Sequence, residues 1–237
     1  MESKGAKVSI IIPIYNGEVH IEKALRSLGE IMAGTAYELI IAEDGSTDKT
    51  PEILEKLRPE FSRMRILFSK TRLGKGKSLS QAILASKGEI CLYMDVDAAS
   101  GLSGIPTAIN AMESADIVSG SRLFPGAKVS RSLTREIFSR GYNLLIRILF
   151  GSKLHDHQCG FKALRREKIT PLLPLVKDTH WFWDTEMLIL AQRKGLKVKE
   201  IPVEWSEGSD STVRVLRDTI YMLGQMGRLF VDLNLGK

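Results

Sequence analysis

Two aspartates in the middle of the chain are spaced to share a cation. Asp95 and Asp97 stand two residues apart, directly after the apolar run 89–94. In an extended segment alternate side chains point the same way, so both carboxylates can reach one ion. Mg²⁺ and Mn²⁺ prefer oxygen ligands and keep positions open for diphosphate oxygens. The triplet alone is equally compatible with a solvated acidic turn, and its place after an apolar run favours a metal site.

Two further polar clusters also follow apolar runs. Residues 13–18, which include Tyr15, follow the run 8–12, and residues 43–48 follow the run 37–42. Both clusters are rich in turn-forming residues, and the second can also cap the next helix. Within it, Asp44 is placed to accept a hydrogen bond from a nucleobase. No glycine-rich phosphate loop follows the first run, which argues against a dehydrogenase or a sugar-nucleotide pyrophosphorylase.

The elements that must position these clusters alternate between strands and helices. Such alternation predicts an α/β fold with an open, mostly parallel sheet and helices on both faces. In such sheets ligands bind at the carboxyl ends of the strands, so the three clusters should converge on one crevice. The pattern predicts strands at 8–12, 37–42, 65–68, 89–94 and 116–119, and helices at 18–31, 50–57 and 78–85.

The second half of the chain has a different character. It contains a long basic amphipathic stretch at 131–150 and a loop at 151–163. A helix at 181–194, a strand at 198–205 and a last amphipathic helix at 212–233 are expected to follow. In the first half, residues 73–77 are expected to form a flexible basic loop. No internal repeat or long linker divides the chain, so a single domain is predicted.

The composition is that of a soluble globular protein. The chain has 237 residues, 43% of them hydrophobic, and a formal net charge of +6. This charge predicts an anionic partner without choosing among nucleic acid, small phosphorylated molecules and a membrane surface. No nucleic-acid-binding motif accompanies the charge, so no nucleic-acid partner is expected and a basic nucleic-acid-binding protein is the remote alternative. Two distant cysteines and no signal peptide or membrane span favour a cytoplasmic protein.

The three clusters, read together, resemble a known family. The segments "VSIIIPIYNGE", "LIIAEDGSTDKT" and "GEICLYMDVDA" resemble glycosyltransferase family 2, whose members have the GT-A fold. In the second half, "SGSRL", "RSLTREIFSRGYN", "DHQCGFKALRRE", "WFWDTEML" and "IPVEWSEGSDSTV" resemble dolichyl-phosphate mannose synthases and dolichyl-phosphate glucosyltransferases. The resemblance covers nearly the whole chain. It implies inverting transfer of glucose or mannose from UDP-glucose or GDP-mannose to a polyprenyl phosphate, with Mg²⁺ or Mn²⁺.

The resemblance also implies an assignment of site residues. A nucleotide-sugar-binding half, 1–121, would precede an acceptor-binding half, 122–237, within one GT-A domain. The implied donor-binding residues are Pro13, Tyr15, Glu18, Asp44, Lys75 and Asp95, and the implied metal ligands are Asp95 and Asp97. The implied acceptor-phosphate residues are Arg122, Arg131, Arg135, Ser139 and Arg214, and the implied catalytic residues are Asp97, Arg122 and Arg135.

Several positions depart from the mannose-synthase pattern. Gly17 stands where these enzymes usually have Glu, and Ala99 stands where they have a Gln that completes the metal site. Thr212 stands where they have Lys, for which Arg214 is the candidate replacement. The segments "DVDAAS" and "WFWDTEML" are closer to the glucosyl branch.

The acceptor decides which side chains the reaction needs. An alcohol acceptor requires a general base, whereas a lipid phosphate is already ionised at neutral pH. The planar guanidinium of Arg suits phosphate recognition, and a metal offsets charge on the leaving diphosphate. A hydroxyl acceptor, as in polysaccharide or glycolipid synthesis, is the alternative. Asp184 and Glu186 are candidate acceptor-side acids or simple helix-terminal carboxylates, and His155 and His157 favour a local structural role over a metal site.

Apolar residues in two helical stretches suggest how a lipid substrate is reached. Residues 144–146 and 148–150, with the last helix, offer apolar surface flanked by Arg147, Arg217 and Arg228. They are either ordinary core-facing stripes or a face that rests on a membrane. The second interpretation predicts peripheral attachment to the cytoplasmic face of a membrane.

The metal assignment can be tested at the second aspartate. Asp97→Ala is expected to remove metal-dependent activity, because a single remaining carboxylate binds a divalent cation poorly. Circular dichroism should show an unchanged fold. Undiminished turnover would show that the metal binds elsewhere.

Overall fold

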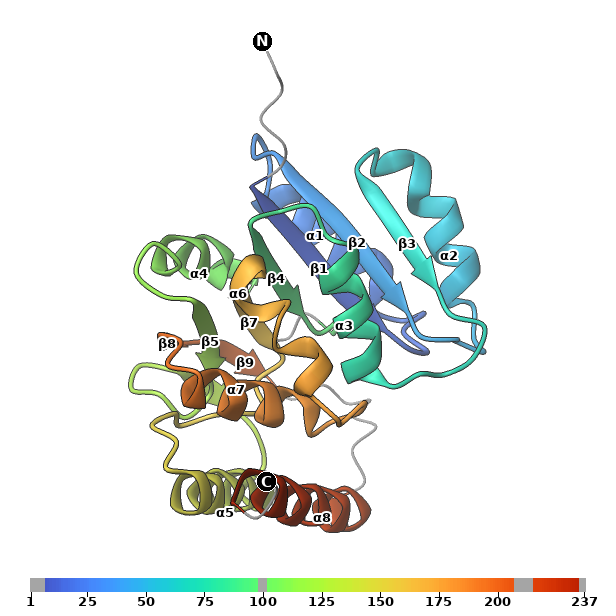
Figure 1. The fold of residues 1–237 in the computed structure, drawn as a ribbon. Helices are drawn as coiled ribbons and strands as arrows, with labels where there is room; N and C mark the ends of the chain where they lie inside the picture. Colours follow the sequence, from blue (N-terminus) through green and yellow to red (C-terminus); the bar gives the residue numbers. More distant parts are fainter. Residues whose placement is uncertain (1–6, 98–101, 207–214, 235–237) are drawn as a thin grey trace.

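The computed structural model describes residues 7–97, 102–206 and 215–234, and its centre is a seven-stranded sheet. The strand order is β3-β2-β1-β4-β7-β5-β8 (Figure 1). All neighbouring pairs are parallel except those of β7, which runs antiparallel to β4 and β5. The strands are β1 (Val8–Ile14), β2 (Tyr37–Glu43), β3 (Met64–Phe68), β4 (Ile90–Met94), β5 (Ile117–Ser121), β7 (Phe161–Arg165) and β8 (Val198–Pro202).

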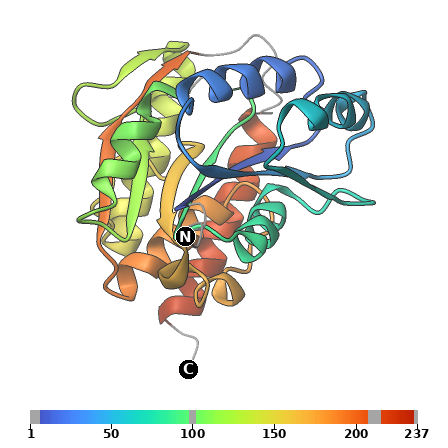
Figure 2. The same cartoon turned by 90° about the horizontal axis from the view of Figure 1, so that it is seen from above.

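Helices cover both faces of this sheet (Figure 2). Strand β1 shows the two sides, because Ile10 and Ile12 belong to one apolar cluster and Ile11 belongs to another. Burial on both faces explains why this strand is almost continuously apolar. The first face carries α1 (Ile21–Ile31), α2 (Thr50–Leu57) and α4 (Ile105–Ala111), and the second carries α3 (Lys75–Ala85), α6 (Arg166–Ile169) and α7 (Trp183–Arg193).

Two long helices form a separate layer away from the sheet. Helices α5 (Leu133–Phe150) and α8 (Val215–Asn234) lie side by side at the bottom of Figure 1. Their inner residues pack with Ile189 of α7 in a third apolar cluster that includes Ile146 and Met226. None of the helices in the described part of the chain is long and apolar enough to cross a membrane.

The fold class is as the sequence predicts, but three local predictions were wrong. Residues 73–77 do not form a flexible loop, since α3 begins at Lys75. The predicted loop 151–163 ends in β7, a central strand whose buried Lys162 interrupts the apolar pattern that would have revealed it. The predicted strand 198–205 is divided between two sheets at Val203. Its last part, β9 (Glu204–Ser206), pairs with β6 (Lys128–Ser130).

Candidate active site

The predicted convergence of the three clusters is confirmed, because β1 lies between β2 and β4. The loops that follow β1 and β2 are joined by hydrogen bonds. The amide nitrogen of Asn16 donates to Ser46 Oγ at 2.9 Å. The backbone amide of Lys49 donates to Glu18 Oε2 at 2.9 Å. Glu18, which was predicted to bind the nucleotide-sugar, therefore supports the start of α2.

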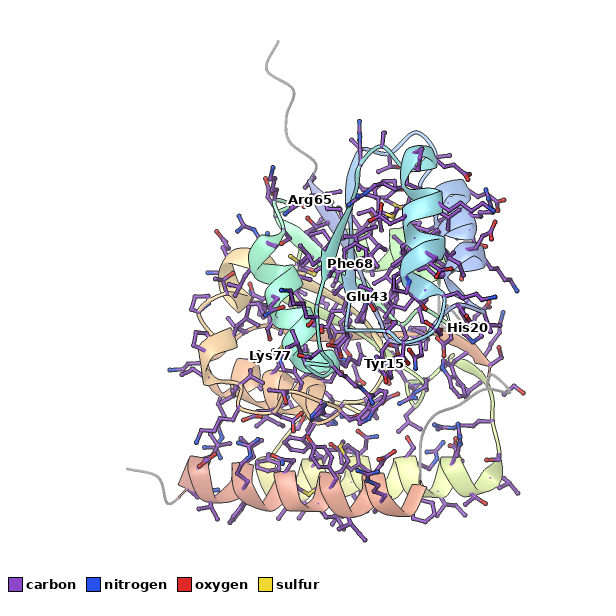
Figure 3. The ribbon with its side chains drawn as sticks, turned by 90° about the vertical axis from the view of Figure 1, so that its right-hand side faces the viewer. Tyr15, His20, Glu43, Arg65, Phe68 and Lys77 are labelled. Atoms are coloured by element: carbon purple, nitrogen blue, oxygen red, sulfur yellow. The ribbon has the colours of Figure 1, made fainter. Side chains whose placement is uncertain are left out.

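The loop between β3 and α3 is held by Asp44, which was also predicted to bind the nucleotide-sugar. Its buried carboxylate accepts hydrogen bonds from the amides of Leu73 at 2.6 Å and Gly74 at 3.0 Å. This loop also places the Arg72 guanidinium 4.0 Å from the centre of the Tyr15 ring. Arg72 is a cation beside Tyr15 that the sequence motifs did not single out. Figure 3 shows Tyr15 and Lys77 at the end of the sheet that faces α5 and α8, with Arg65 at the other end.

Lys75 lies directly beside the first aspartate of the Asp-x-Asp motif. Its Nζ is 2.6 Å from Asp95 Oδ1 and 4.0 Å from Asp184 Oδ2. Burial disfavours the ammonium form, but the carboxylates of Asp95 and Asp184 raise the pKa of Lys75 above its ordinary value. A permanent positive charge therefore stands next to the predicted metal site.

Asp184 is the centre of a buried charge cluster behind this site. It lies in the first turn of α7 and is 3% exposed. Lys162 Nζ contacts its Oδ1 at 2.8 Å, and the Tyr93 hydroxyl donates to the same oxygen. Burial alone would raise the pKa of Asp184, but the ammonium groups of Lys162 and Lys75 hold it below its usual range. Asp184 is thus a neutralised counter-ion rather than an acceptor-side acid.

The backbone at Gly160 fits tightly against Asp95. The amide of Asp95 donates to the Gly160 carbonyl at 3.0 Å. A Cβ atom on Gly160 would lie 1.7 Å from Asp95 Oδ2, so any side chain there would displace the carboxylate. This glycine was missed in the sequence, although a glycine just before a strand often marks a close approach of two backbones.

The two aspartates fit a divalent cation whose remaining coordination positions are filled by the substrate. The Asp95 side chain is 37% exposed, and Asp97 is exposed. In the described ranges, no three His, Cys, Asp or Glu side chains gather as a metal site. Two carboxylates with open positions match the preference of Mg²⁺ or Mn²⁺ for ligands shared with diphosphate oxygens. Ala99, the position of the missing third ligand, lies outside the described residues.

Arg122, predicted to bind the acceptor phosphate, is fixed by Asp156. Its Nε and Nη2 donate to the two carboxylate oxygens at 2.7 and 3.0 Å. Burial works against both charges, yet each partner stabilises the other, so the pKa of Arg122 is raised and that of Asp156 is lowered. The guanidinium is also 5.7 Å from the Trp205 ring. Arg122 is therefore a rigid cation at the carboxyl end of β5.

The other predicted acceptor residues lie at the start of α5. Arg131 precedes the helix and pairs with Glu136, which also binds Arg140. Arg135 and Ser139 are four residues apart and share one face of the helix. Arg214 lies outside the described residues.

Comparisons with known proteins agree with this arrangement. A family model described as "Glycosyl transferase family 2" matches residues 9–172. The chain belongs to glycosyltransferase family 2. Within it, the chain is 40% identical over 235 residues to Glycosyltransferase AglD of Haloferax volcanii, covering 97% of this chain and 38% of AglD. It is 31% identical over 239 residues to Dolichyl-phosphate beta-glucosyltransferase of Saccharomyces cerevisiae, covering 91% of this chain and 71% of that protein. The chain thus spans less than half the length of AglD.

Solved structures confirm the GT-A fold of this family 2 member. Glucosyl-3-phosphoglycerate synthase from Mycobacterium tuberculosis in complex with UDP superimposes with a TM-score of 0.69 at 22% identity, covering 96% of this chain and 80% of that chain. The same enzyme with Mn²⁺, UDP-glucose and phosphoglyceric acid gives a TM-score of 0.69 at 21% identity, covering 96% and 79%.

The histidine-containing loop of this family 2 chain has a structural role, as its sequence favours. His155 Nδ1 is 2.7 Å from Glu200 Oε2. His157 is fully buried between Ser152 Oγ, 2.8 Å from Nε2, and Asn143 Oδ1, 2.7 Å from Nδ1. A neutral imidazole satisfies both partners, with Nδ1–H as donor and Nε2 as acceptor. Burial lowers the pKa of His157 to about 3.

His157 should make stability depend on pH. Below the ordinary pKa of 6.5, His157 is protonated in the unfolded chain. In the folded protein it stays neutral until the pH falls to about 3. The contribution of His157 is therefore complete above this ordinary value and is lost as the pH falls. As the pH falls from above 6.5 to about 5, protonation of His157 in the unfolded chain should lower the free energy of unfolding by about 2 kcal/mol.

Thermal or urea unfolding of the wild type and His157→Gln at several pH values measures this effect. The variant should be less stable near neutral pH, because the buried hydrogen bonds change, but it should lose stability less steeply on acidification. Parallel curves for the two proteins would contradict the assignment.

Proposed function

We propose that this family 2 enzyme transfers glucose from a nucleotide-sugar to a polyprenyl phosphate with inversion. The observation that carries the proposal is the state of Asp184, the carboxylate just behind Lys75 and Asp95. It is buried and neutralised by two lysines, so it is unsuited to act as a base toward an alcohol. A phosphate acceptor needs no base, because its oxygen is already ionised. The similarity to dolichyl-phosphate beta-glucosyltransferases supports the same acceptor class and favours glucose over mannose.

The donor would bind to the first half of the chain, residues 1–121. Pro13, Tyr15 and Asp44 lie at the strand ends where the nucleoside would sit. Lys75 supplies a fixed ammonium for the diphosphate, and Arg72 offers a second cation beside Tyr15. Asp95 and Asp97 would hold Mg²⁺ or Mn²⁺. When bound, the metal would stabilise the charge that develops on the leaving diphosphate.

The acceptor phosphate would bind to cations of the second half, residues 122–237. Arg122 is held rigid by Asp156, so it can position an anion without losing side-chain entropy on binding. Arg135 and Ser139 offer a guanidinium and a hydroxyl from neighbouring turns of α5. Arg131 and Arg214 complete the proposed set. These residues place and orient the phosphate oxygen for attack on the sugar carbon.

The lipid part of the acceptor would remain in a membrane beneath α5 and α8. The outer faces of these two helices carry large apolar side chains that are widely exposed, including Ile137 at 70%, Ile148 at 69% and Ile220 at 63%. Arg147 and Arg217 are exposed on the same helices, whereas Arg228 turns inward to Glu186. An apolar face with basic residues fits an anionic bilayer surface. This arrangement supports peripheral attachment to a membrane, which we propose to be at its cytoplasmic face.

A transfer assay tests the proposed reaction. The protein is incubated with labelled UDP-glucose or GDP-mannose, polyprenyl phosphate, and Mg²⁺ or Mn²⁺. Label should pass into the organic phase from UDP-glucose, and free polyprenol, which lacks the ionised oxygen, should not replace the phosphate. Removal of the metal with a chelator should abolish transfer. Label in a hydroxyl acceptor but none in polyprenyl phosphate would instead support the polysaccharide or glycolipid alternative.

Sedimentation with vesicles that contain anionic phospholipids tests the membrane surface. Ile148→Glu on α5 should reduce the vesicle-binding constant by about tenfold, because partial burial of an isoleucine contributes about 1.5 kcal/mol. Leu84→Glu is the matched control, since Leu84 is 57% exposed but lies on α3. Equal binding of both variants and the wild type would contradict the assignment.

A further inference from the structure

Helix α8 is joined to the start of α7 by a small polar cluster. The Tyr221 hydroxyl donates to Asp178 Oδ2, and Arg228 donates to both carboxylate oxygens of Glu186 at 3.0 and 2.7 Å. The two acidic residues are joined to each other, because the amide of Asp178 donates to Glu186 Oε2 at 2.9 Å. We call Asp178, Glu186, Tyr221 and Arg228 the Asp178 clamp. Its acidic members are buried, at 5% and 1% exposure.

The segment that follows Asp178 packs against the first turn of α3. The Thr179 carbonyl accepts a hydrogen bond from the amide of Lys77 at 3.2 Å. A Cβ atom on Gly74 would lie 2.4 Å from the Thr179 carbonyl oxygen and 2.3 Å from His180 Nδ1, so this close approach requires glycine. The Trp181 ring centre is 5.5 Å from Lys75 Nζ. Residues 179–181 therefore touch the turn that carries Lys75 at three points.

These contacts form a continuous path from α8 to the metal motif. The path runs from Tyr221 to Asp178, through residues 179–181 to Lys75, and from Lys75 to Asp95 at 2.6 Å. The amide of His180 donates to Asp178 Oδ1 at 2.8 Å, so the clamp also sets the conformation of the connecting segment. His180 further contacts the Tyr221 ring, with centroids 6.4 Å apart. Every step is a direct contact between side chains or backbone groups.

We propose that the Asp178 clamp positions Lys75 for the donor diphosphate, so that α8 supports the donor site from behind residues 178–181. Tyr221 and Arg228 hold residues 178–181 against the first turn of α3, and this turn presents the ammonium group. The inference rests on the proposed function, because it takes Lys75 as a ligand of the nucleotide-sugar. It gives α8 two roles, an outer face toward lipid and an inner face toward the donor. A change in the position of α8 would then also change the affinity for the nucleotide-sugar.

Tyr221→Phe in the full chain tests the clamp with a minimal change. Loss of one hydrogen bond to a carboxylate should raise the KM for UDP-glucose by about tenfold. The kcat should change far less, because the reacting groups are untouched. For Arg228, replacement by Gln should give the same rise in KM, and Arg228→Lys should restore part of the loss by keeping the charge beside Glu186.

Lys177→Gln is the matched control. Lys177 bonds Asp232 of α8 at 3.0 Å, so it links the same two parts of the chain, but its side chain is 61% exposed. Asp232 keeps its other partner, Arg228 at 3.1 Å, when Lys177 is replaced. Exposed ion pairs contribute little, and the KM of this variant should equal that of the wild type.

Two outcomes would overturn the inference. A lower melting temperature for Tyr221→Phe with an unchanged KM would show that the clamp only stabilises the fold. An equal rise in KM for Lys177→Gln would show a general loosening of α8.

Calorimetric binding of UDP with Mn²⁺ to the same variants separates this inference from the proposed function. If the wild type binds UDP but transfers no glucose to polyprenyl phosphate, the proposed reaction fails. Weaker UDP binding by Tyr221→Phe would still support the clamp, and unchanged binding would refute it. If Tyr221→Phe does not fold, the comparison of Arg228→Gln with the wild type decides in the same way.

Discussion

An alternation of charges that runs from the half-exposed Asp95 through Lys75 to the buried Asp184 and Lys162 is the interaction on which the rest of the site depends. Each ammonium group stands beside a carboxylate, and the four residues come from the segment just after β4 and from α3, α7 and β7. Removing one member of such a cluster leaves an uncompensated charge in the interior, which is far more costly than a missing surface pair. The four elements must therefore meet in one arrangement. This requirement places an antiparallel strand, β7, in the centre of an otherwise parallel sheet.

Close approach of backbones is the second condition of this arrangement. Gly160 allows Asp95 to lie against β7, and Gly74 allows residues 179–180 to lie against α3. Gly76 has the same function for Trp183, whose Cβ would be 2.4 Å and whose ring would be 2.5 Å from a Cβ at that position. The glycines of the Gly-Lys-Gly sequence therefore serve packing rather than flexibility. The same contacts connect the site to α8.

The matched charges also bear on the chemistry. Since its charge is balanced by two lysines, Asp184 is poorly suited to accept a proton. An acceptor that is already ionised does not need a general base. The end of the sheet that carries Tyr15 and Lys77 faces the α5–α8 layer (Figure 3). The proposed donor site would then lie above the exposed apolar faces of α5 and α8, which suits an acceptor whose phosphate is water-soluble and whose tail is not. The proposed substrate thus follows from geometry and charge as well as from similarity.

The sequence by itself determined the fold class, the convergence of three strand ends and the family. These depend on local signals, namely apolar runs of strand length and polar clusters that follow them, and such signals survive without tertiary contacts. Only the tertiary structure decided the roles of Lys162 and Gly160, because a buried lysine looks polar and a packed glycine looks flexible until their neighbours are known. It likewise decided that Asp184 is a counter-ion and that Arg228 points inward. The state of a charged side chain is set by what lies within a few ångströms, and residues far apart in the chain supply those neighbours.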